Sequence, residues 1–108
     1  MKSSVIKALQ NLSDKEGETF VKVFEHGSMS VEIYRPVNID PQTPHMQDEL
    51  YVIISGSGDF YLNGGVSSFQ QGDVLFVPAF AEHRFVNFTN DFATWVIFYG
   101  PEGGEGKF

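Results

Sequence analysis

Apolar and polar residues alternate with a period of two along most of the chain after residue 18. This period is typical of β-strands, whose successive side chains point to opposite faces of a sheet. Clusters of glycine, proline, asparagine and aspartate separate the alternating runs and indicate turns. The pattern predicts strands over residues 19–25, 29–34, 50–54, 59–62, 66–70, 74–77, 83–88 and 92–99. Short strands with frequent turns indicate an all-β fold of the sandwich or barrel class.

The N-terminal part of the chain has a different period. Apolar residues recur at helical spacing between residues 4 and 12, where a serine can cap the start, and this predicts a short helix. We expect a single domain, because no linker or internal repeat divides the sequence. The predicted parts are a helix and loop over 1–18, a β-barrel over 19–99 and a flexible glycine-rich tail over 100–108, all within one domain spanning 1–108.

The most informative stretch covers residues 43–56, where a polar segment leads into an apolar run. If the whole stretch is a strand, five alternate residues share one face. Three of the five are polar or charged, and burying such groups without partners costs several kcal/mol, so this face needs a partner for them. The five residues are His45, Gln47, Glu49, Tyr51 and Ile53.

The composition limits the partners that we expect. The 108 residues include 14 acidic and 7 basic side chains, giving a formal net charge of −7, and the basic ones are scattered. Without a basic cluster, neither nucleic acid nor an anionic membrane surface is an expected partner. The chain has no cysteine, which excludes disulfides and thiolate metal sites. The N-terminus lacks a secretory pattern, so we expect a cytoplasmic protein.

Two stretches of the chain resemble the motifs of the cupin family. The first family motif is G-x5-H-x-H-x3/4-E-x6-G, and its second His, its Glu and its final Gly match His45, Glu49 and Gly56. Thr43 stands in place of the first His of the motif, and Val37 stands in place of its first Gly. The substitution of Thr43 changes the chemistry of the motif, because it removes one imidazole.

The second family motif is G-x5-P-x-G-x2-H-x3-N. Gly72, Pro78, His83 and Asn87 match it at the required spacing, with Phe80 in place of the internal Gly. Both motifs occur in the family's order and are separated by a short gap, as in small single-domain cupins. The chain therefore resembles the cupin superfamily, and in particular the small proteins with a Cupin 2-like conserved barrel.

This resemblance implies a cupin-type β-barrel, also called a double-stranded β-helix or jelly roll, with a short N-terminal helix. It implies that His45, Glu49 and His83 converge on a metal ion inside the barrel. Two imidazoles and one carboxylate suit a divalent ion such as Fe, Mn, Ni or Zn. Gln47 and Thr43 are candidate additional ligands or pocket residues. In the alternative without metal, Glu49 pairs with one of the histidines.

Alternation along the two ligand-bearing strands predicts the walls of a pocket. Arg35 ends a predicted strand at the expected mouth of this pocket, where it could meet an anionic ligand. Asp48 points to the opposite face from the ligands and is expected at the surface. The predicted pocket-lining residues are Tyr51, Ile53, Phe85 and Arg35.

The sequence leaves three functions open. The first is a metal-dependent enzyme that acts on a small molecule, as an oxygenase or isomerase; the second is a barrel that binds or senses a small ligand, with or without metal; the third is a barrel kept for its interaction surface. No candidate nucleophile lies on the predicted pocket face, which argues against covalent catalysis and leaves the catalytic residues unassigned. The aromatic content of 15% predicts more exposed apolar surface than a monomer tolerates, and hence a homodimer.

Overall fold

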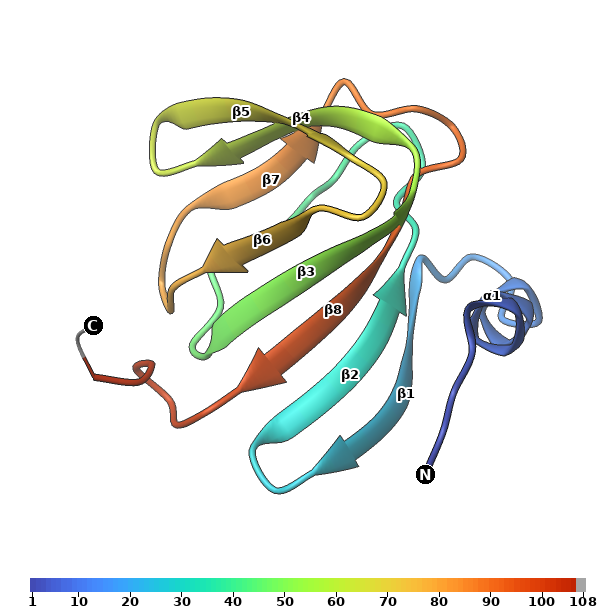
Figure 1. The fold of residues 1–108 in the computed structure, drawn as a ribbon, viewed down its shortest axis with the longest axis horizontal. Coiled ribbons are helices and arrows are strands. Elements are labelled where there is room, and N and C mark those ends of the chain that lie inside the picture. The colour runs from blue at the N-terminus through green and yellow to red at the C-terminus, as the bar shows by residue number, and fades with distance from the viewer. Residues whose placement is uncertain (107–108) are drawn as a thin grey trace.

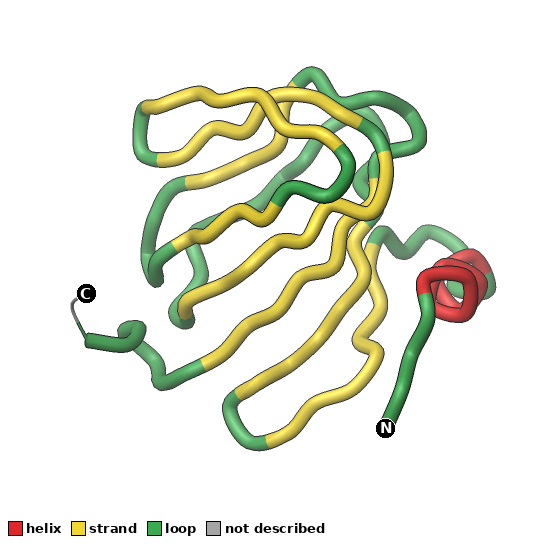
Figure 2. Tube along the Cα trace, viewed as in Figure 1, coloured by secondary structure: helices red, strands yellow, loops and turns green. Residues whose placement is uncertain are grey.

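The computed structural model of the protein describes residues 1–106 as one short helix followed by strands. Helix α1 spans Val5–Ser13. The strands are β1 (Phe20–His26), β2 (Met29–Tyr34), β3 (Asp48–Ser55), β4 (Ser57–Leu62), β5 (Gly65–Gln70), β6 (Val74–Val77), β7 (His83–Val86) and β8 (Ala93–Tyr99). Strands dominate the trace in Figure 2, which confirms the predicted all-β class with an N-terminal helix.

The strands form two antiparallel sheets. The larger sheet has the order β1-β2-β8-β3-β6, and the smaller one has the order β5-β4-β7. Figure 1 shows the smaller sheet at the top of the view, with the strands of the larger sheet following one another below it. Aromatic side chains from both sheets, among them Tyr51, Phe60 and Phe85, pack against one another in a shared core. Burial of this aromatic surface holds the two sheets together.

Strand β3 provides the best test of the predicted alternation. Glu49, Tyr51 and Ile53 share its inner face as expected, and each is at most 2% exposed. His45 and Gln47 precede the strand, because a bend at residues 46–47 interrupts the extended backbone. The expectation that all five residues lie on one strand face is therefore wrong for these two, whose positions depend on the loop.

Helix α1 covers the outer face of the strands at one edge of the larger sheet. The side chain of Ser4 caps the helix by accepting a hydrogen bond from the backbone N–H of Lys7 (3.2 Å). Ala8 and Leu12 are buried on the helix and pack in one cluster with apolar residues of β1 and β2. Trp95 of β8 also packs against this cluster, so the helix supplies the cover that an aromatic residue on the outer face needs.

The segment after β8 folds back onto the barrel. The backbone N–H of Gly103 donates to the carbonyl of Met46 (2.7 Å), and that of Glu105 donates to Oδ2 of Asp48 (2.8 Å). These two bonds join Gly103 and Glu105 to the start of β3 and the loop before it. The predicted flexibility of the tail stays a prediction, and its residues 107–108 lie outside the described residues.

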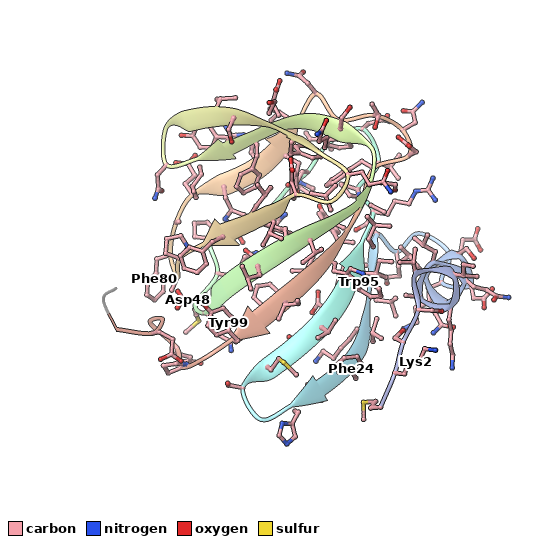
Figure 3. The ribbon with its side chains drawn as sticks, viewed as in Figure 1. Lys2, Phe24, Asp48, Phe80, Trp95 and Tyr99 are labelled. Carbon is pink, nitrogen blue, oxygen red and sulfur yellow. The ribbon has the colours of Figure 1, made fainter. Side chains whose placement is uncertain are left out.

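Asp48 is buried, contrary to the surface position expected for it. Its side chain is 5% exposed and also accepts a hydrogen bond from the backbone N–H of Ala79 (2.9 Å). Figure 3 shows Asp48 at the start of β3, near Phe80 and Tyr99. The alternation placed Asp48 on the outer face correctly, but the returning C-terminal segment covers that face. Within residues 1–106, no helix has the length and apolarity needed to span a bilayer.

Candidate metal centre

Three side chains from separate segments converge inside the barrel. Glu49 lies near the start of β3, His83 begins β7, and His45 lies in the loop before β3. Nε2 of His83 lies 3.0 Å from Oε1 of Glu49, and Nε2 of His45 lies 3.9 Å from the same oxygen. The candidate ligand atoms of all three residues lie within 4.8 Å of one another. The structure thus brings together the three residues that the motifs singled out.

The carboxylate of Glu49 lacks a well-directed donor. It is 1% exposed, and neither oxygen accepts an aligned hydrogen bond from the residues that the structure describes. Although Nε2 of His83 is close to Oε1, its hydrogen-bond direction points to another acceptor, Oε1 of Gln42 (3.1 Å). A buried carboxylate is costly without a compensating charge, so this group calls for a cation. The residues therefore fit a metal ion, and two His with one carboxylate form a donor set known for divalent metals.

The two imidazoles are held by contacts outside the donor cluster. Nδ1 of His83 lies 2.9 Å from the carbonyl of Ala81, which can only accept, so Nδ1 carries the hydrogen and Nε2 faces the site. The ring of His45 packs edge-on against Phe98, with 5.0 Å between ring centroids. The carbonyl of His45 also accepts a hydrogen bond from the backbone N–H of Phe80 (2.7 Å). The contact of His83 Nδ1 with a backbone carbonyl fixes the ring of a candidate ligand, and such contacts are typical of metal sites.

The two histidines have opposite pKa shifts. Burial lowers the pKa of His45, and this effect outweighs the negative charge of Glu49. Burial also acts to lower the pKa of His83, but the contact with Glu49 and the hydrogen bond to Ala81 outweigh it and raise the pKa. His45 is therefore ready to bind a cation as a neutral ring, whereas a metal ion must compete with a proton at His83.

Two residues at the centre, Gln42 and Asp40, are absent from the sequence-based prediction. Oε1 of Gln42 lies 3.0 Å from Nε2 of His45 and accepts a hydrogen bond from the hydroxyl of Tyr51 (3.0 Å). Asp40 is 4% exposed, and its carboxylate accepts hydrogen bonds from the Tyr34 hydroxyl and from the side-chain amide of Gln42 (3.1 Å). Both lie in a proline-punctuated loop without periodicity, so the sequence contained no signal for their burial.

Several predicted pocket residues lie close to the donor cluster. Tyr51 is fully buried, with its ring centroid 6.2 Å from that of His83. Phe85 packs against Tyr51, and Ile53 belongs to the same apolar core. Both residues therefore belong to the core that packs around Tyr51. Thr43 is exposed and lines a cavity beside the ligands.

Gln47 and Arg35 lie elsewhere. The side-chain amide of Gln47 donates to the carbonyls of Ser28 (2.8 Å) and Gly100 (2.9 Å), so it joins the β1–β2 turn to the C-terminal segment and does not face the donors. Arg35 is exposed and lines a separate hollow beside helix α1, with Leu9 and Leu12, rather than the mouth of the site. Its predicted place at the pocket mouth is wrong, because Arg35 lines the hollow beside helix α1 and not the cavity that contains His45 and Glu49.

A cavity of about 410 Å³ opens beside the ligands. Its walls include Tyr34 of β2, Phe98 of β8, and the candidate ligands His45 and Glu49. Glu32 also lines it and was not predicted. Burial raises the pKa of Glu32, Lys22 opposes the rise, and the charge of Glu49 adds to it. The volume suits a small molecule.

These features define a small antiparallel β-barrel with an internal candidate site for a divalent metal. A family model described as the cupin domain (Cupin_2) matches residues 30–99, so the chain belongs to the cupin family. The predicted resemblance is thus confirmed.

Relatives and solved structures agree with this assignment. The chain is 31% identical over 85 residues to an uncharacterized protein of Streptomyces coelicolor, covering 77% of this chain and 81% of that one. It is similar to a Cupin 2 conserved barrel domain protein from Salinispora arenicola, with 16% identity, a TM-score of 0.64, and coverage of 75% of this chain and 74% of that one. It is also similar to a chain from the crystal structures of the DMSP lyases RdDddP and RnDddQII, with 27% identity, a TM-score of 0.60, and coverage of 71% of this chain and 41% of that one.

Proposed function

We propose that the protein is a metal-dependent enzyme acting on a small molecule, of the oxygenase or isomerase type. The observation that carries this proposal is the buried carboxylate of Glu49, which has no aligned donor among the described residues and faces Nε2 of two histidines. A divalent ion, with Fe, Mn, Ni and Zn as the candidates, would be held by His45, Glu49 and His83. Three protein ligands leave coordination positions for substrate or water.

In this proposal, the residues of the site have separate roles in metal binding, substrate binding and proton transfer. His45, Glu49 and His83 would hold the ion, which would supply Lewis-acid chemistry at the site. The cavity beside the ligands would receive the substrate against the aromatic side chains of Tyr34 and Phe98. Glu32 is the carboxyl group of this cavity outside the ligand set, and its raised pKa suits proton transfer to or from a bound substrate. The likeness to a DMSP lyase chain at 27% identity supports an enzyme on this barrel.

A second candidate function uses the same cavity without chemistry. The cavity volume of about 410 Å³ is sufficient for binding a small ligand, with or without metal, as a sensor would. We further propose a homodimer, which the exposed apolar side chains of Phe20, Val37 and Ile39 support.

The test of the metal centre is elemental analysis of untagged protein purified without oxygen, beside the His83→Ala variant. We expect close to one equivalent of Fe, Mn, Ni or Zn in the natural protein and a loss of at least tenfold in the variant, because His83 supplies one of three ligands. Reconstitution with each metal in turn guards against loss during purification. If neither protein takes up metal even then, the metalloenzyme is rejected. Ligand binding that persists in EDTA then favours the sensor.

A further inference from the structure

We propose that Gln42 supplies a fourth ligand to the metal through its side-chain oxygen, Oε1. This inference rests on the proposed metal centre and adds a residue that neither cupin motif contains. Oε1 of Gln42 lies 3.0 Å from Nε2 of His45 and 3.1 Å from Nε2 of His83. Neighbouring ligands of an octahedral ion with bonds of about 2.1 Å are separated by about 3.0 Å. The amide oxygen therefore stands at the separation from both imidazoles that two ligands of one ion have.

The orientation of the Gln42 amide is fixed by its neighbours. Its nitrogen, Nε2, donates to Oδ2 of Asp40 (3.1 Å), and that carboxylate also accepts from the backbone N–H of Phe85 (2.8 Å). Because a carboxylate accepts and does not donate, the amide NH₂ must face Asp40 and the carbonyl must face the histidines. Asp40 is 4% exposed, so this support is buried.

The hydrogen-bond roles at the centre call for a cation between the Gln42 oxygen and His83. Nδ1 of His83 faces the carbonyl of Ala81, so in the neutral ring the lone pair is on Nε2. That lone pair points at Oε1 of Gln42 and lies 3.0 Å from Oε1 of Glu49, and both oxygens are acceptors. In the neutral ring these acceptors repel one another, and either a proton on Nε2 or a metal ion among them removes the repulsion. A metal ion would be held by the three atoms that face one another here, Nε2 of His83, Oε1 of Gln42 and Oε1 of Glu49.

This arrangement compensates for the missing first histidine of the cupin motif. Thr43 occupies that motif position, but it is exposed, while the preceding residue Gln42 reaches the centre. A neutral amide oxygen adds a hard ligand and no charge, so a divalent ion with Glu49 keeps one formal positive charge.

The test compares Co²⁺ binding by the metal-free natural protein and by Gln42→Leu, which keeps a similar volume without a ligand atom. We expect the variant to bind Co²⁺ at least about tenfold more weakly, the lower end of the loss seen when a partner of a metal ligand is removed. We also expect its visible Co²⁺ absorption to change, because the number of ligands falls. Circular dichroism establishes that the variant is folded.

Three further variants separate the possible explanations. Thr43→Val probes the motif position itself, and we expect the natural cobalt spectrum. Gln42→Glu keeps an oxygen at the same reach and serves if Gln42→Leu does not fold; because a carboxylate replaces the amide as ligand, we expect it to bind Co²⁺ with an altered spectrum. His83→Ala is expected to lose Co²⁺ binding altogether.

The outcomes distinguish this inference from the metal centre itself. If the natural protein binds Co²⁺, His83→Ala does not, and folded Gln42→Leu has the natural affinity and spectrum, the metal centre stands and the assignment of Gln42 is overturned. The same holds if Thr43→Val rather than Gln42→Leu alters the spectrum, or if folded Gln42→Glu keeps the natural spectrum unchanged. If the natural protein binds no metal at all, the metal centre and the fourth ligand are both rejected.

Discussion

At the scale of single residues, Asp40 and Gln42 connect the loop after β2 to the barrel interior. Asp40 accepts a hydrogen bond from the backbone of Phe85 in β7, across a sequence separation of 45 residues. Figure 1 shows this loop passing behind β7 and β6 before it reaches β3. A buried carboxylate that receives several hydrogen bonds fixes the loop at this point. The loop therefore belongs to the site, although it has no regular secondary structure at that point.

Phe80 shows a cost of departing from the family motif. It stands where the motif has glycine and keeps a φ of +67°, which is unfavourable for a residue with a Cβ atom. The side chain is 59% exposed, so it gains little from burial. Its backbone N–H nevertheless donates a hydrogen bond to the carbonyl of His45 (2.7 Å). This bond helps to stabilise the positive φ of Phe80.

We expect Phe80→Gly to be more stable than Phe80→Ala by about 1 kcal/mol, because alanine keeps the strain of a positive φ and glycine does not. Both substitutions remove the same ring contacts, so their difference isolates the backbone. Urea unfolding of the two variants measures it. An alanine variant as stable as the glycine variant would show that the strain is absent.

At the scale of elements, the helix and the barrel core are two separate apolar clusters. One cluster holds Ala8 and Leu12 of α1 against Val21 and Ile33, while the aromatic core lies between the sheets. The helix is short, so its stability comes from packing on the sheet rather than from its own hydrogen bonds. The ligands lie with the aromatic core and do not touch the helix cluster.

Leu12→Ala should destabilise the fold by about 2–3 kcal/mol, because it removes a side chain that is 5% exposed and leaves a cavity under the helix. Ile6→Ala is the matched control on the same helix; with 81% of Ile6 exposed, we expect a change below about 0.5 kcal/mol. Thermal unfolding measures both. Metal affinity should be unchanged in folded Leu12→Ala, and a clear loss would show that the two clusters are coupled.

At the scale of the whole molecule, the proposed metal centre would link the stability of the fold to pH. The pKa of His83 is raised in the folded protein, so its proton stabilises the metal-free fold below the unfolded value of about 6.5, and this contribution is lost as pH rises through the folded value. A metal ion needs the deprotonated ring, so its contribution has the opposite sign. At a metal concentration of 100 times Kd the ion would add about 2.7 kcal/mol.

We therefore expect the stabilisation by added Zn²⁺ or Co²⁺ to be largest above the folded pKa of His83 and to shrink as pH falls through it. Thermal shifts with and without metal, between pH 5.5 and 8.5, measure this dependence. In EDTA, the stabilisation by the His83 proton should be lost as the pH rises, while His45, whose pKa is lowered, contributes with the opposite sign. His83→Gln should remove the first contribution and leave the second. His26→Gln, at the exposed last residue of β1, is the control and should leave both profiles intact. A metal-induced shift that does not vary with pH would contradict the role of His83.

The sequence by itself determined the elements and the family. The pleat of a strand imposes a period of two and the helix a period of 3.6, so the predicted strands at 29–34 and 74–77 coincide with β2 and β6, and the others differ mainly at their ends. Motif spacing selected His45, Glu49 and His83, because two of them lie on strands whose register fixes where their side chains point.

Only the tertiary structure decided what surrounds those ligands. Gln42 lies beside the histidines, whereas Gln47 and Arg35 lie away from them. Nothing in the local sequence pattern distinguishes these three residues. Asp48 is buried because the segment after β8 packs over it and donates a hydrogen bond to its carboxylate. The physical reason is that loop conformation depends on hydrogen bonds between residues far apart in the chain, such as Asp40 with Phe85, which leave no periodic trace in the sequence.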